Sequence, residues 1–584
     1  MKNTVIAIET AETTAVESAA ARPSERTWRT GVPFQLLVLA LVSAVLSLPM
    51  LLRGPMPASH DGTQHINFCT HFAEQFWHGD LYPRWLINMN HGLGTPSLFV
   101  YPPMPAFVYS LLLPGARLLH LNAFNLGEYL SLLVSAIAAW LWIGTMASQR
   151  VALFVAGIYV LLPYHLAVDF YRRDALAECW ALAFMPLALY FTVRIVQRKR
   201  FAVSGLAVSY ALLIVSHLIT VLMFSALPLL LAFVLAERGR RMRALLTVAG
   251  GLGLGTALSS FYLLPALASA KYFSVTRAGY RSDWSIDTNL LAFGKGLFTG
   301  NSGKSGFVRA VSLITVNTAL FIALCGGLAL KYGPRTRRAQ IFLWMGVCLL
   351  PLFMMSSVSM HVWQSFRSLA GAIQYPWRLD SILCIAALPL AAFLLSDIAA
   401  RVQLRYKSLI IVLLFAATWT AGFVATIHRY SLPPYKGKLV DQDDGWFNAW
   451  SPEGLNEISA LHASAGPHAR FLSGQGEAVA TRWSPRDIEV HTNCAACGPL
   501  MINQFYYPAW QATLLPENTS LPVTVEMPEG LVKVSVPAGQ HDVRFTIPRA
   551  APERLGDGIA ALSCALILML LGFEMSGYRF RRAL

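Results

Sequence analysis

The sequence predicts a polytopic, all-helical membrane protein that carries one small β-sandwich near its C-terminus. Only 13% of its 584 residues are charged and 55% are hydrophobic, whereas a soluble domain usually carries about 25% charged residues. Long apolar runs recur along most of the chain, and with their flanks they approach the roughly 20 residues that a helix needs to cross a bilayer. Basic residues cluster between these runs, which is typical of short cytoplasmic loops. The net charge of +15 therefore indicates membrane topology and not nucleic-acid binding.

We expect about twelve membrane-spanning helices with both termini in the cytoplasm, because this arrangement puts every basic cluster inside. The apolar stretch 98–121 is excluded from the set, since its four prolines break or kink a helix and an extra crossing would move every later basic cluster outside. We interpret it as helix at the outer membrane face; a thirteenth crossing with the amino terminus outside is the alternative. The expected spans are 33–53, 126–146, 151–167, 177–195, 203–217, 219–236, 244–267, 309–330, 339–357, 379–396, 408–427 and 558–577.

This topology divides the chain into four parts. Residues 1–32 lack the apolar core of a cleaved signal and are expected to form a disordered cytoplasmic tail. The transmembrane domain covers 33–427 and has a long first outer loop at 54–125. A periplasmic β-rich domain covers 428–557, and residues 558–584 form the last helix and a basic cytoplasmic tail.

Alternating apolar and polar residues predict the β-sandwich. The alternation runs through 521–547, where Pro-Glu-Gly and Pro-Ala-Gly-Gln interrupt it as turns, and 486–491 is a further strand candidate. Cys494 and Cys497 form a CxxC pair in this polar region. A zinc site would need a second ligand pair, so we expect a local disulfide in an oxidising compartment, with free thiols as the alternative.

The first outer loop holds an acidic residue directly after the first span. Asp61 stands between His60 and His65, and Arg84 and Trp85 follow further along the loop. A carboxylate at the membrane face with aromatic neighbours suits sugar binding and proton abstraction from a hydroxyl. The alternative is a solvated loop with an interfacial belt of Trp and Tyr.

The second outer loop carries two arginines on the side of the membrane where basic residues are rare. Bidentate capture of a lipid-linked phosphate would explain Arg172 and Arg173. Pairing with Asp169, Asp174 or Glu178 is the alternative, and the two explanations are compatible.

Two further residues lie at outer ends of spans. A lone histidine such as His217 is more often a hydrogen-bonded packing residue than a functional one. Interfacial anchoring and phosphate binding explain Arg378 equally well. Ionisable residues are nearly absent from the middle of the spans and no internal repeat is evident, which argues against a proton-coupled transporter.

Taken together, these motifs resemble the GT-C superfamily of polyprenyl-phosphate-sugar-dependent glycosyltransferases. They are most similar to the bacterial membrane proteins called 6-pyruvoyl-tetrahydropterin-synthase-related or YfhO-type. The name implies no pterin chemistry, because the soluble enzyme's zinc-binding histidine pattern is not apparent. The matching segments are HDGTQH at 60–65, GDLYPRW at 79–85, GLGTPSLFVYPP at 92–103, YRRDALAE at 171–178, SHLIT at 216–220, QYPWR at 374–378 and YYPAWQATL at 506–514.

The resemblance implies an inverting glycosyltransferase of the GT-C fold, with Asp61 as the catalytic base and Glu178 as a second catalytic acidic residue. Many members of the superfamily carry a paired acidic motif where this chain has His60 and Asp61. That difference leaves dependence on a divalent metal open, and no metal ligand is assigned. The expected substrate-binding residues are His60, His65, Arg84, Trp85, Tyr101, Arg172, Arg173, His217 and Arg378.

The expected partners are a polyprenyl-phosphate-linked sugar, a glycan, lipid or protein acceptor, and membrane lipids. We expect a multi-pass protein of the bacterial inner membrane that modifies cell-envelope glycans. Two functions from other classes remain as alternatives: a lipid or glycan transporter without chemistry, and an envelope assembly factor that uses the β-domain to hold a partner.

Overall fold

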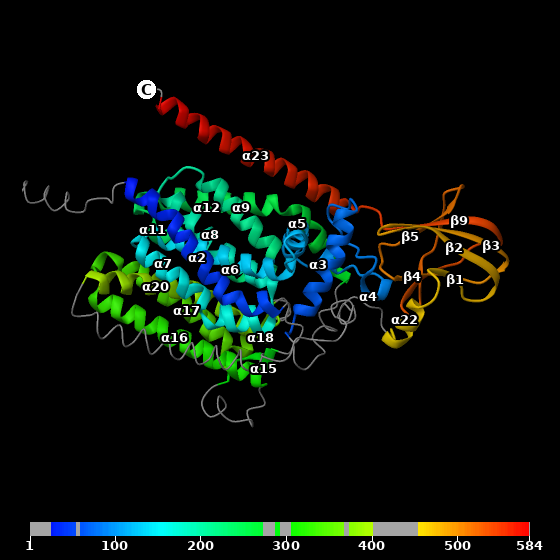
Figure 1. Ribbon diagram of the computed structural model, residues 1–584, viewed down its shortest axis with the longest axis horizontal. Coiled ribbons are helices and arrows are strands. Elements are labelled where there is room, and N and C mark those ends of the chain that lie inside the picture. Colours follow the sequence, from blue (N-terminus) through cyan, green and yellow to red (C-terminus); the bar gives the residue numbers. More distant parts are fainter. Residues whose placement is uncertain are drawn as a thin grey trace, which may run out of the picture.

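The computed structural model describes residues 25–53, 59–272, 286–292, 305–366, 373–400 and 454–582. Its helices gather into one bundle, and its strands form a separate lobe at one end of the long axis (Figure 1). The last helix starts where these two parts meet and runs away from the β-lobe (Figure 1). The expected span 408–427 lies outside the described residues.

Most of the described chain is helical. The long helices are α2 (Glu25–Arg53), α6 (Ala123–Ile143), α7 (Gln149–Leu161), α8 (Leu176–Val196), α9 (Ala202–Ser216), α11 (Ala226–Leu235), α12 (Arg241–Leu258), α13 (Ser260–Ser269), α16 (Gly306–Tyr332), α17 (Arg338–Met355), α20 (Asp380–Ala400) and α23 (Ala551–Arg582). Shorter elements are α3 (Gly62–Trp77), α4 (Met89–Gly92), η1 (Ser97–Phe99), α5 (Met104–Leu118), η2 (Tyr164–Arg173), α10 (Leu218–Phe224), η3 (Arg238–Arg240), η4 (Ala270–Tyr272), α15 (Ile286–Asn289), η8 (Arg335–Arg337), η9 (Ser357–Ser359), α18 (Met360–Ser365), η10 (Pro376–Leu379) and α22 (Glu457–Ser464).

Nine helices in the described ranges are long and apolar enough to cross a membrane, and each corresponds to a span expected from the sequence. The expected span 203–217 is α9, which has only 15 residues. The expected span 244–267 is broken, because the segments Arg238–Leu258 and Ser260–Tyr272 are bent by 71°. The excluded stretch 98–121 contains α5, a 15-residue helix interrupted by Pro114.

The break between α12 and α13 leaves a backbone carbonyl for a distant partner. Pro265 lies inside α13 and has no N–H to donate to the carbonyl four residues earlier. That carbonyl, Phe261 O, accepts from Arg84 Nη2 at 2.6 Å. The loop that carries Arg84 is thereby tied to a helix about 177 residues later in the chain.

The β-lobe consists of two antiparallel sheets. One has the strand order β1-β4-β8-β7 and the other β2-β3-β9-β5-β6. Alternate side chains of β3, β4, β8 and β9 fill one shared apolar core, as expected for a sandwich. The strands are β1 (Ala469–Phe471), β2 (Gly474–Ser484), β3 (Asp487–Cys497), β4 (Leu500–Phe505), β5 (Gln511–Leu515), β6 (Thr519–Leu521), β7 (Thr524–Glu526), β8 (Leu531–Val534) and β9 (Gly539–Thr546).

The segment between α3 and η1 docks onto this lobe. Trp85 is fully buried in the core of the sandwich, and its indole N–H donates to Gln504 Oε1 at 2.7 Å. The Phe505 N–H donates to Leu93 O at 2.6 Å. Replacing a buried Trp by Ala costs about 3–5 kcal/mol, so Trp85 anchors the lobe to the bundle.

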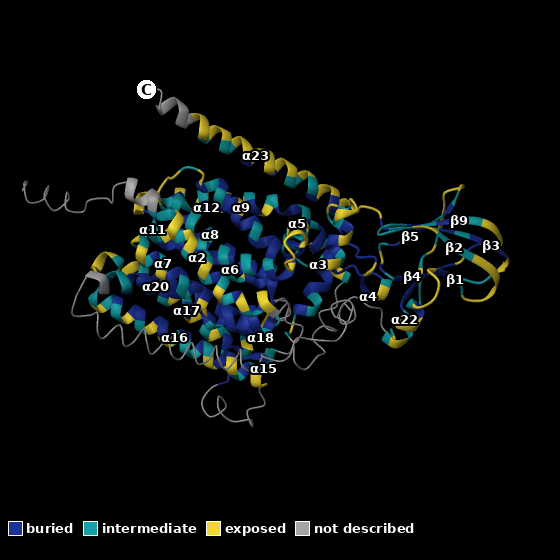
Figure 2. Cartoon of the chain, viewed as in Figure 1, coloured by how far each residue is buried: buried dark blue, intermediate teal, exposed yellow. Residues whose placement is uncertain are grey.

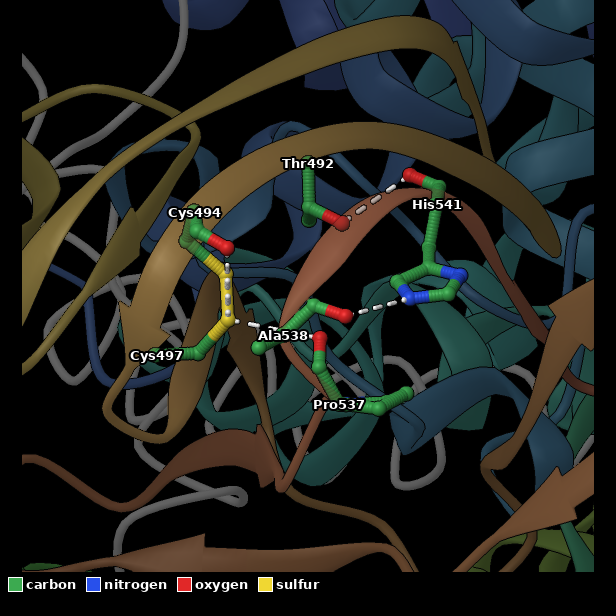
Figure 3. The surroundings of a disulfide bond; sticks show 6 residues. All are labelled: Thr492, Cys494, Cys497, Pro537, Ala538 and His541. Carbon is green, nitrogen blue, oxygen red and sulfur yellow. Dashed lines mark hydrogen bonds between the residues drawn. A yellow bond between two sulfur atoms is a disulfide. The ribbon is translucent and has the colours of Figure 1, made fainter.

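The expected disulfide is present. Cys494 and Cys497 are bonded at the end of β3, with Cα atoms 5.5 Å apart (Figure 3). The Cys497 sulfur also lies 3.3 Å from Pro537 O, just before β9. Other described cysteines are unpaired and, apart from Cys564, buried.

Helix α23 is the least buried of the candidate spans. Only 11% of its apolar window is buried, against 83% for Pro376–Asp397, and exposed residues cover most of its length (Figure 2). It begins at Ala551, before the expected residue 558, and its first turns pack on α13. There the Ser260 hydroxyl donates to Gly556 O at 2.7 Å.

Candidate functional site

The loop segments around Asp61 and Arg173, which are far apart in the sequence, are joined through their backbones. The Asp61 N–H donates to Arg173 O at 2.8 Å and the His60 N–H to Arg172 O at 3.3 Å. Gly62 makes this approach feasible, because a Cβ there would lie 2.3 Å from both Asp174 Oδ2 and Ser59 Oγ. The His-Asp-Gly motif therefore holds Asp61 beside the end of η2.

Element η2 is a ten-residue π-helix, Tyr164–Arg173. π-Helical turns are rare and frequently occur at functional sites. This one ends at Asp174, whose φ of 56° is left-handed, a conformation that Asp tolerates better than most residues. The turn directs Arg173 back toward the preceding turn and toward the start of α8.

Arg173 is the centre of a buried set of charges. Its Nη1 donates to Asp169 Oδ1 and to Glu178 Oε2, each at 2.6 Å. Its Nη2 lies 3.4 Å from Asp61 Oδ2, and Arg378 Nε lies 3.7 Å from Glu178 Oε2. We call Asp61, Asp169, Arg173, Glu178 and Arg378 the carboxylate–arginine cluster.

One member of the cluster differs from the rest in exposure. The Asp61 side chain is 40% exposed, whereas the other four side chains are at most 8% exposed. Three carboxylates face two guanidinium groups, so the cluster carries one more negative than positive charge when all are ionised. Asp61 is thus the carboxylate that can contact a ligand.

Among the described residues, the unused hydrogen-bonding capacity of the cluster lies on Asp169 Oδ2 and on Arg378. Its Nη1 donates to Ile373 O and to Gln374 Oε1, each at 3.0 Å. Its Nε is buried and has no hydrogen-bond partner among the residues that the structure describes. Glu178 is instead fully engaged, since Tyr164 OH also donates to its Oε1 at 2.8 Å.

Aromatic rings border the cluster. The Arg173 guanidinium lies over the Trp377 ring at 5.0 Å, and Tyr375 stacks on Trp377 with ring centroids 4.9 Å apart. Phe307 makes T-shaped ring contacts with Trp377 and His60, with centroids 5.4 Å and 4.9 Å apart, respectively. Flat apolar faces beside polar groups are what a sugar ring needs, because its C–H and O–H groups lie on different faces.

His65 is held as a neutral ring by two partners. Its Nδ1 lies 2.9 Å from Asp174 O and its Nε2 2.5 Å from Tyr101 OH. A carbonyl can only accept, so Nδ1 is assigned the proton and Nε2 accepts from the tyrosine. Burial lowers the pKa of His65. Partial burial, and then the charge of Arg172, lower the pKa of His60 to about 4.

Asp174 lies behind Asp61 and is buried. Its Oδ2 accepts from Ser59 Oγ at 3.4 Å. Burial, together with the negative charge of Asp61, raises the pKa of Asp174 to about 6. Asp174 therefore holds its proton to higher pH than an ordinary aspartate does, close to the accessible Asp61.

The structure brings together most, but not all, of the site residues expected from the sequence. The joined set is Asp61, His60, His65, Tyr101, Arg172, Arg173, Glu178 and Arg378. His217 is buried and bonds Thr220 Oγ1 at 2.8 Å, as a packing histidine would, although the charges of Glu178 and Arg378 reach it. The sequence indicated Asp169 only as a possible ion-pair partner of Arg172 or Arg173.

Arg84 and Trp85 belong to a different place. Trp85 lies inside the β-lobe core, and Arg84 Nη1 lies 3.4 Å from Glu553 Oε2 in the first turn of α23. Arg486 forms two bonds of 3.0 Å to the same carboxylate. We call Arg84, Arg486 and Glu553 the Glu553 ion-pair group. The sequence signal for this group is Glu553, an acidic residue at the start of the last helix, and the sequence analysis did not identify it.

Within the described ranges, no group of three His, Cys, Asp or Glu side chains is placed to hold a metal ion. The cluster would offer an ion three carboxylates, but two of them already bond Arg173 at 2.6 Å.

Comparison with known proteins gave a family model and matches among the solved structures. Residues 99–422 match the model of the 6-pyruvoyl-tetrahydropterin synthase related domain, described as a membrane protein. A structural match is arabinofuranosyltransferase AftD from Mycobacteria, with 17% identity, a TM-score of 0.40 and 77% coverage of this chain. This chain spans about a third (32%) of that enzyme's length. No curated protein matches the chain.

Proposed function

We propose that this chain, which belongs to the 6-pyruvoyl-tetrahydropterin-synthase-related family of membrane proteins, is an inverting glycosyltransferase that uses a polyprenyl-phosphate-linked sugar. The observation that carries the proposal is the accessible Asp61 carboxylate beside four buried charged side chains. The order of the loop motifs, which resembles that of GT-C enzymes, supports the same reaction class.

In the proposed step, Asp61 accepts the proton of the acceptor hydroxyl as its oxygen attacks the anomeric carbon of the donor sugar. The bond from that carbon to the phosphate oxygen breaks, and the polyprenyl phosphate leaves with the electron pair. Attack opposite to the leaving group inverts the configuration. General-base catalysis of this kind contributes about 10²–10⁴-fold to a rate.

The leaving phosphate needs positive charge more than it needs an acid. Arg378 suits this role because its Nε is buried without a hydrogen-bond partner among the described residues. Arg173 is saturated by carboxylates, so we assign it and Glu178 to holding Asp61 and Arg378 in position. Arg172 remains a candidate for a second phosphate contact.

We further propose that the site faces the periplasm and that both termini are cytoplasmic. The basic clusters between the apolar runs favour this orientation. The envelope glycan that accepts the sugar would then meet Asp61 on the outer side of the inner membrane.

The test is to incubate the purified full chain, in detergent or reconstituted vesicles, with a labelled polyprenyl-phosphate sugar and an envelope glycan extract. Labelled glycan product is expected, and Asp61→Asn should lower the rate at least 100-fold while preserving expression and thermal stability. Translocation of the donor without product would indicate a transporter instead. Unchanged turnover in the Asp61→Asn protein would remove Asp61 as the base.

A further inference from the structure

A cleft lies where the helix bundle, the β-lobe and α23 meet, the region from which α23 departs in Figure 1. Its volume is about 740 Å³, within the range of small-molecule binding sites. No part of the carboxylate–arginine cluster lines it. The lining residues are Asp80, Leu81, Tyr82, Arg84, Phe107, Phe261, Pro485, Arg486, Ile547, Arg549, Glu553, Asp557 and Ala560.

The charges of this junction cleft are balanced. The floor is the Glu553 ion-pair group, in which two arginines face one buried carboxylate. At the rim, Arg549 pairs with Asp557. Three arginines and three carboxylates line the cleft in total, so it offers no net attraction to a phosphate or to any other strongly charged group.

Two polar groups of the cleft have unused capacity. Asp80 accepts the Tyr82 N–H through Oδ1 at 3.2 Å, and within the described residues no basic side chain pairs with it. Arg84 is 4% exposed, and its Nε is buried without a hydrogen-bond partner in the described part of the chain. An acceptor and a donor therefore remain for a hydroxyl-bearing ligand.

Aromatic rings also line the cleft. Tyr82 lies 5.9 Å from Phe261 and 5.6 Å from Phe107 between ring centroids, and the Arg84 guanidinium covers the Tyr82 ring at 4.0 Å. The cleft combines aromatic rings with charged side chains whose charges cancel. Such a cleft suits a neutral sugar better than an anionic lipid headgroup.

The cleft is separated from Asp61 by the length of α3. Asp61 precedes the first residue of this 16-residue helix and Asp80 follows its end, which corresponds to about 24 Å at 1.5 Å per residue. A single sugar cannot reach both places, whereas an extended glycan can.

From these observations we propose that the junction cleft binds a neutral glycan, as a distal subsite for an extended acceptor chain. Asp80 and Arg84 would bond its hydroxyls while Tyr82, Phe107 and Phe261 contact its ring faces. The role as acceptor subsite rests on the proposed glycosyl transfer, but the binding itself does not.

The experiment applies the fluorescently labelled full chain to a glycan array that carries neutral, uronic-acid-bearing and phosphorylated glycans. We expect saturable binding to neutral glycans that strengthens with chain length. Asp80→Ala and Leu81→Trp should each weaken it at least tenfold, because the first removes the acceptor and the second fills the cleft. Leu81 is 72% exposed, so its replacement leaves the fold intact. Glu517→Ala, an exposed carboxylate of the β-lobe, is the matched control and should bind as the unchanged protein does.

An array without neutral glycan binding would overturn the proposal, and so would binding that is restricted to acidic glycans or insensitive to both cleft variants. The Asp61→Asn protein separates this outcome from the proposed chemistry. It should bind the array normally, because Asp61 lies about 24 Å away. If the Asp61→Asn protein binds the array normally and keeps its turnover, only the catalytic assignment is contradicted. If it loses turnover and no glycan on the array is bound, only the distal subsite is contradicted.

Discussion

Two groups of arginines and carboxylates in the described part of the chain differ in charge balance and in exposure. In the carboxylate–arginine cluster, three carboxylates face two arginines and the surplus acid, Asp61, is 40% exposed. In the Glu553 ion-pair group, two arginines enclose a single carboxylate that is 2% exposed. A carboxylate that is itself buried between arginines joins parts of a fold, whereas an accessible carboxylate held by such a pair can act on a ligand. The comparison teaches that exposure, more than the presence of charge, separates the chemical site from the structural one.

The largest effect on both fold and activity is expected from Glu178→Gln. The change leaves Arg173 and Arg378 facing each other with one carboxylate less, and breaking a buried ion pair from one side costs about 3–5 kcal/mol. The melting temperature of the purified protein and its turnover rate should both fall sharply. Glu237→Gln is the control, because the pair of Glu237 with Arg240 is exposed and should contribute about 0–1 kcal/mol. Equal melting temperatures of the two variants would contradict the cluster's role.

A smaller and more local effect is expected from Glu553→Gln. Without its charge, Arg84 and Arg486 lose the partner that joins the first outer loop to the β-lobe, at a cost of about 3 kcal/mol to the junction. Limited proteolysis should cut between the lobe and α23 several times faster. Glu526→Gln, which removes a half-buried pair with Lys533 inside the lobe, should leave the cleavage rate unchanged. A junction equally resistant in both variants would argue that the lobe is held by Trp85 alone.

Gly62→Ala should displace Asp61 without removing its charge. The added Cβ would lie 2.3 Å from Asp174 Oδ2 and Ser59 Oγ, and such overpacking costs about 1–3 kcal/mol. Turnover should fall roughly tenfold or more, since a misplacement of about 1 Å can cost 10²-fold. In Gly157→Ala the Cβ meets no atom within 4 Å, so that variant should keep its turnover. Full activity in Gly62→Ala would show that the position of Asp61 is not fixed by this contact.

The smallest effect is a change in pH dependence. The pKa of Asp174 is raised to about 6 by burial, so the folded state holds this proton more tightly than the unfolded chain. The resulting stabilisation is complete below about pH 4, the ordinary value for Asp, and is lost as the pH rises through 6. Asp174→Asn should therefore gain stability relative to the unchanged protein between pH 4 and 6, by about 1.4 kcal/mol for each unit of pKa shift.

Melting temperatures of the two proteins, measured between pH 4 and 6, check the predicted sign of the stability difference. The low pKa of His60 works in the opposite direction, because its stabilisation appears only as the pH rises, and the variant isolates the contribution of Asp174. Glu517→Gln, at an exposed position of the β-lobe, should follow the unchanged protein throughout. A pH-independent difference would contradict the burial of an ionisable Asp174.

The sequence predicts local features of the molecule well and long-range docking poorly. Apolar runs identify the spans because each helix must satisfy its own backbone in lipid, and the Cys494–Cys497 pairing follows from close spacing. Asp61, Arg173 and Glu178 could be assigned to one site because the expected topology puts their loops on one side. Nothing local predicts that Trp85 bonds Gln504, 419 residues later. Trp85 therefore looks like a site residue in the sequence and is an anchor in the structure.

The most direct test of the assignment of Asp61 as the accessible base is a paired measurement on Asp61→Asn and Glu74→Gln. Both variants convert a carboxylate to an amide, one at the start of α3 and one on its exposed face, where Glu74 is 48% exposed. Turnover of a labelled polyprenyl-phosphate sugar and the melting temperature are recorded for each. We expect Asp61→Asn to lose at least 100-fold in rate with a melting temperature close to that of the unchanged protein, and Glu74→Gln to retain both. An active Asp61→Asn protein, or one that is inactive only because it unfolds, would contradict the assignment of Asp61 as the accessible base.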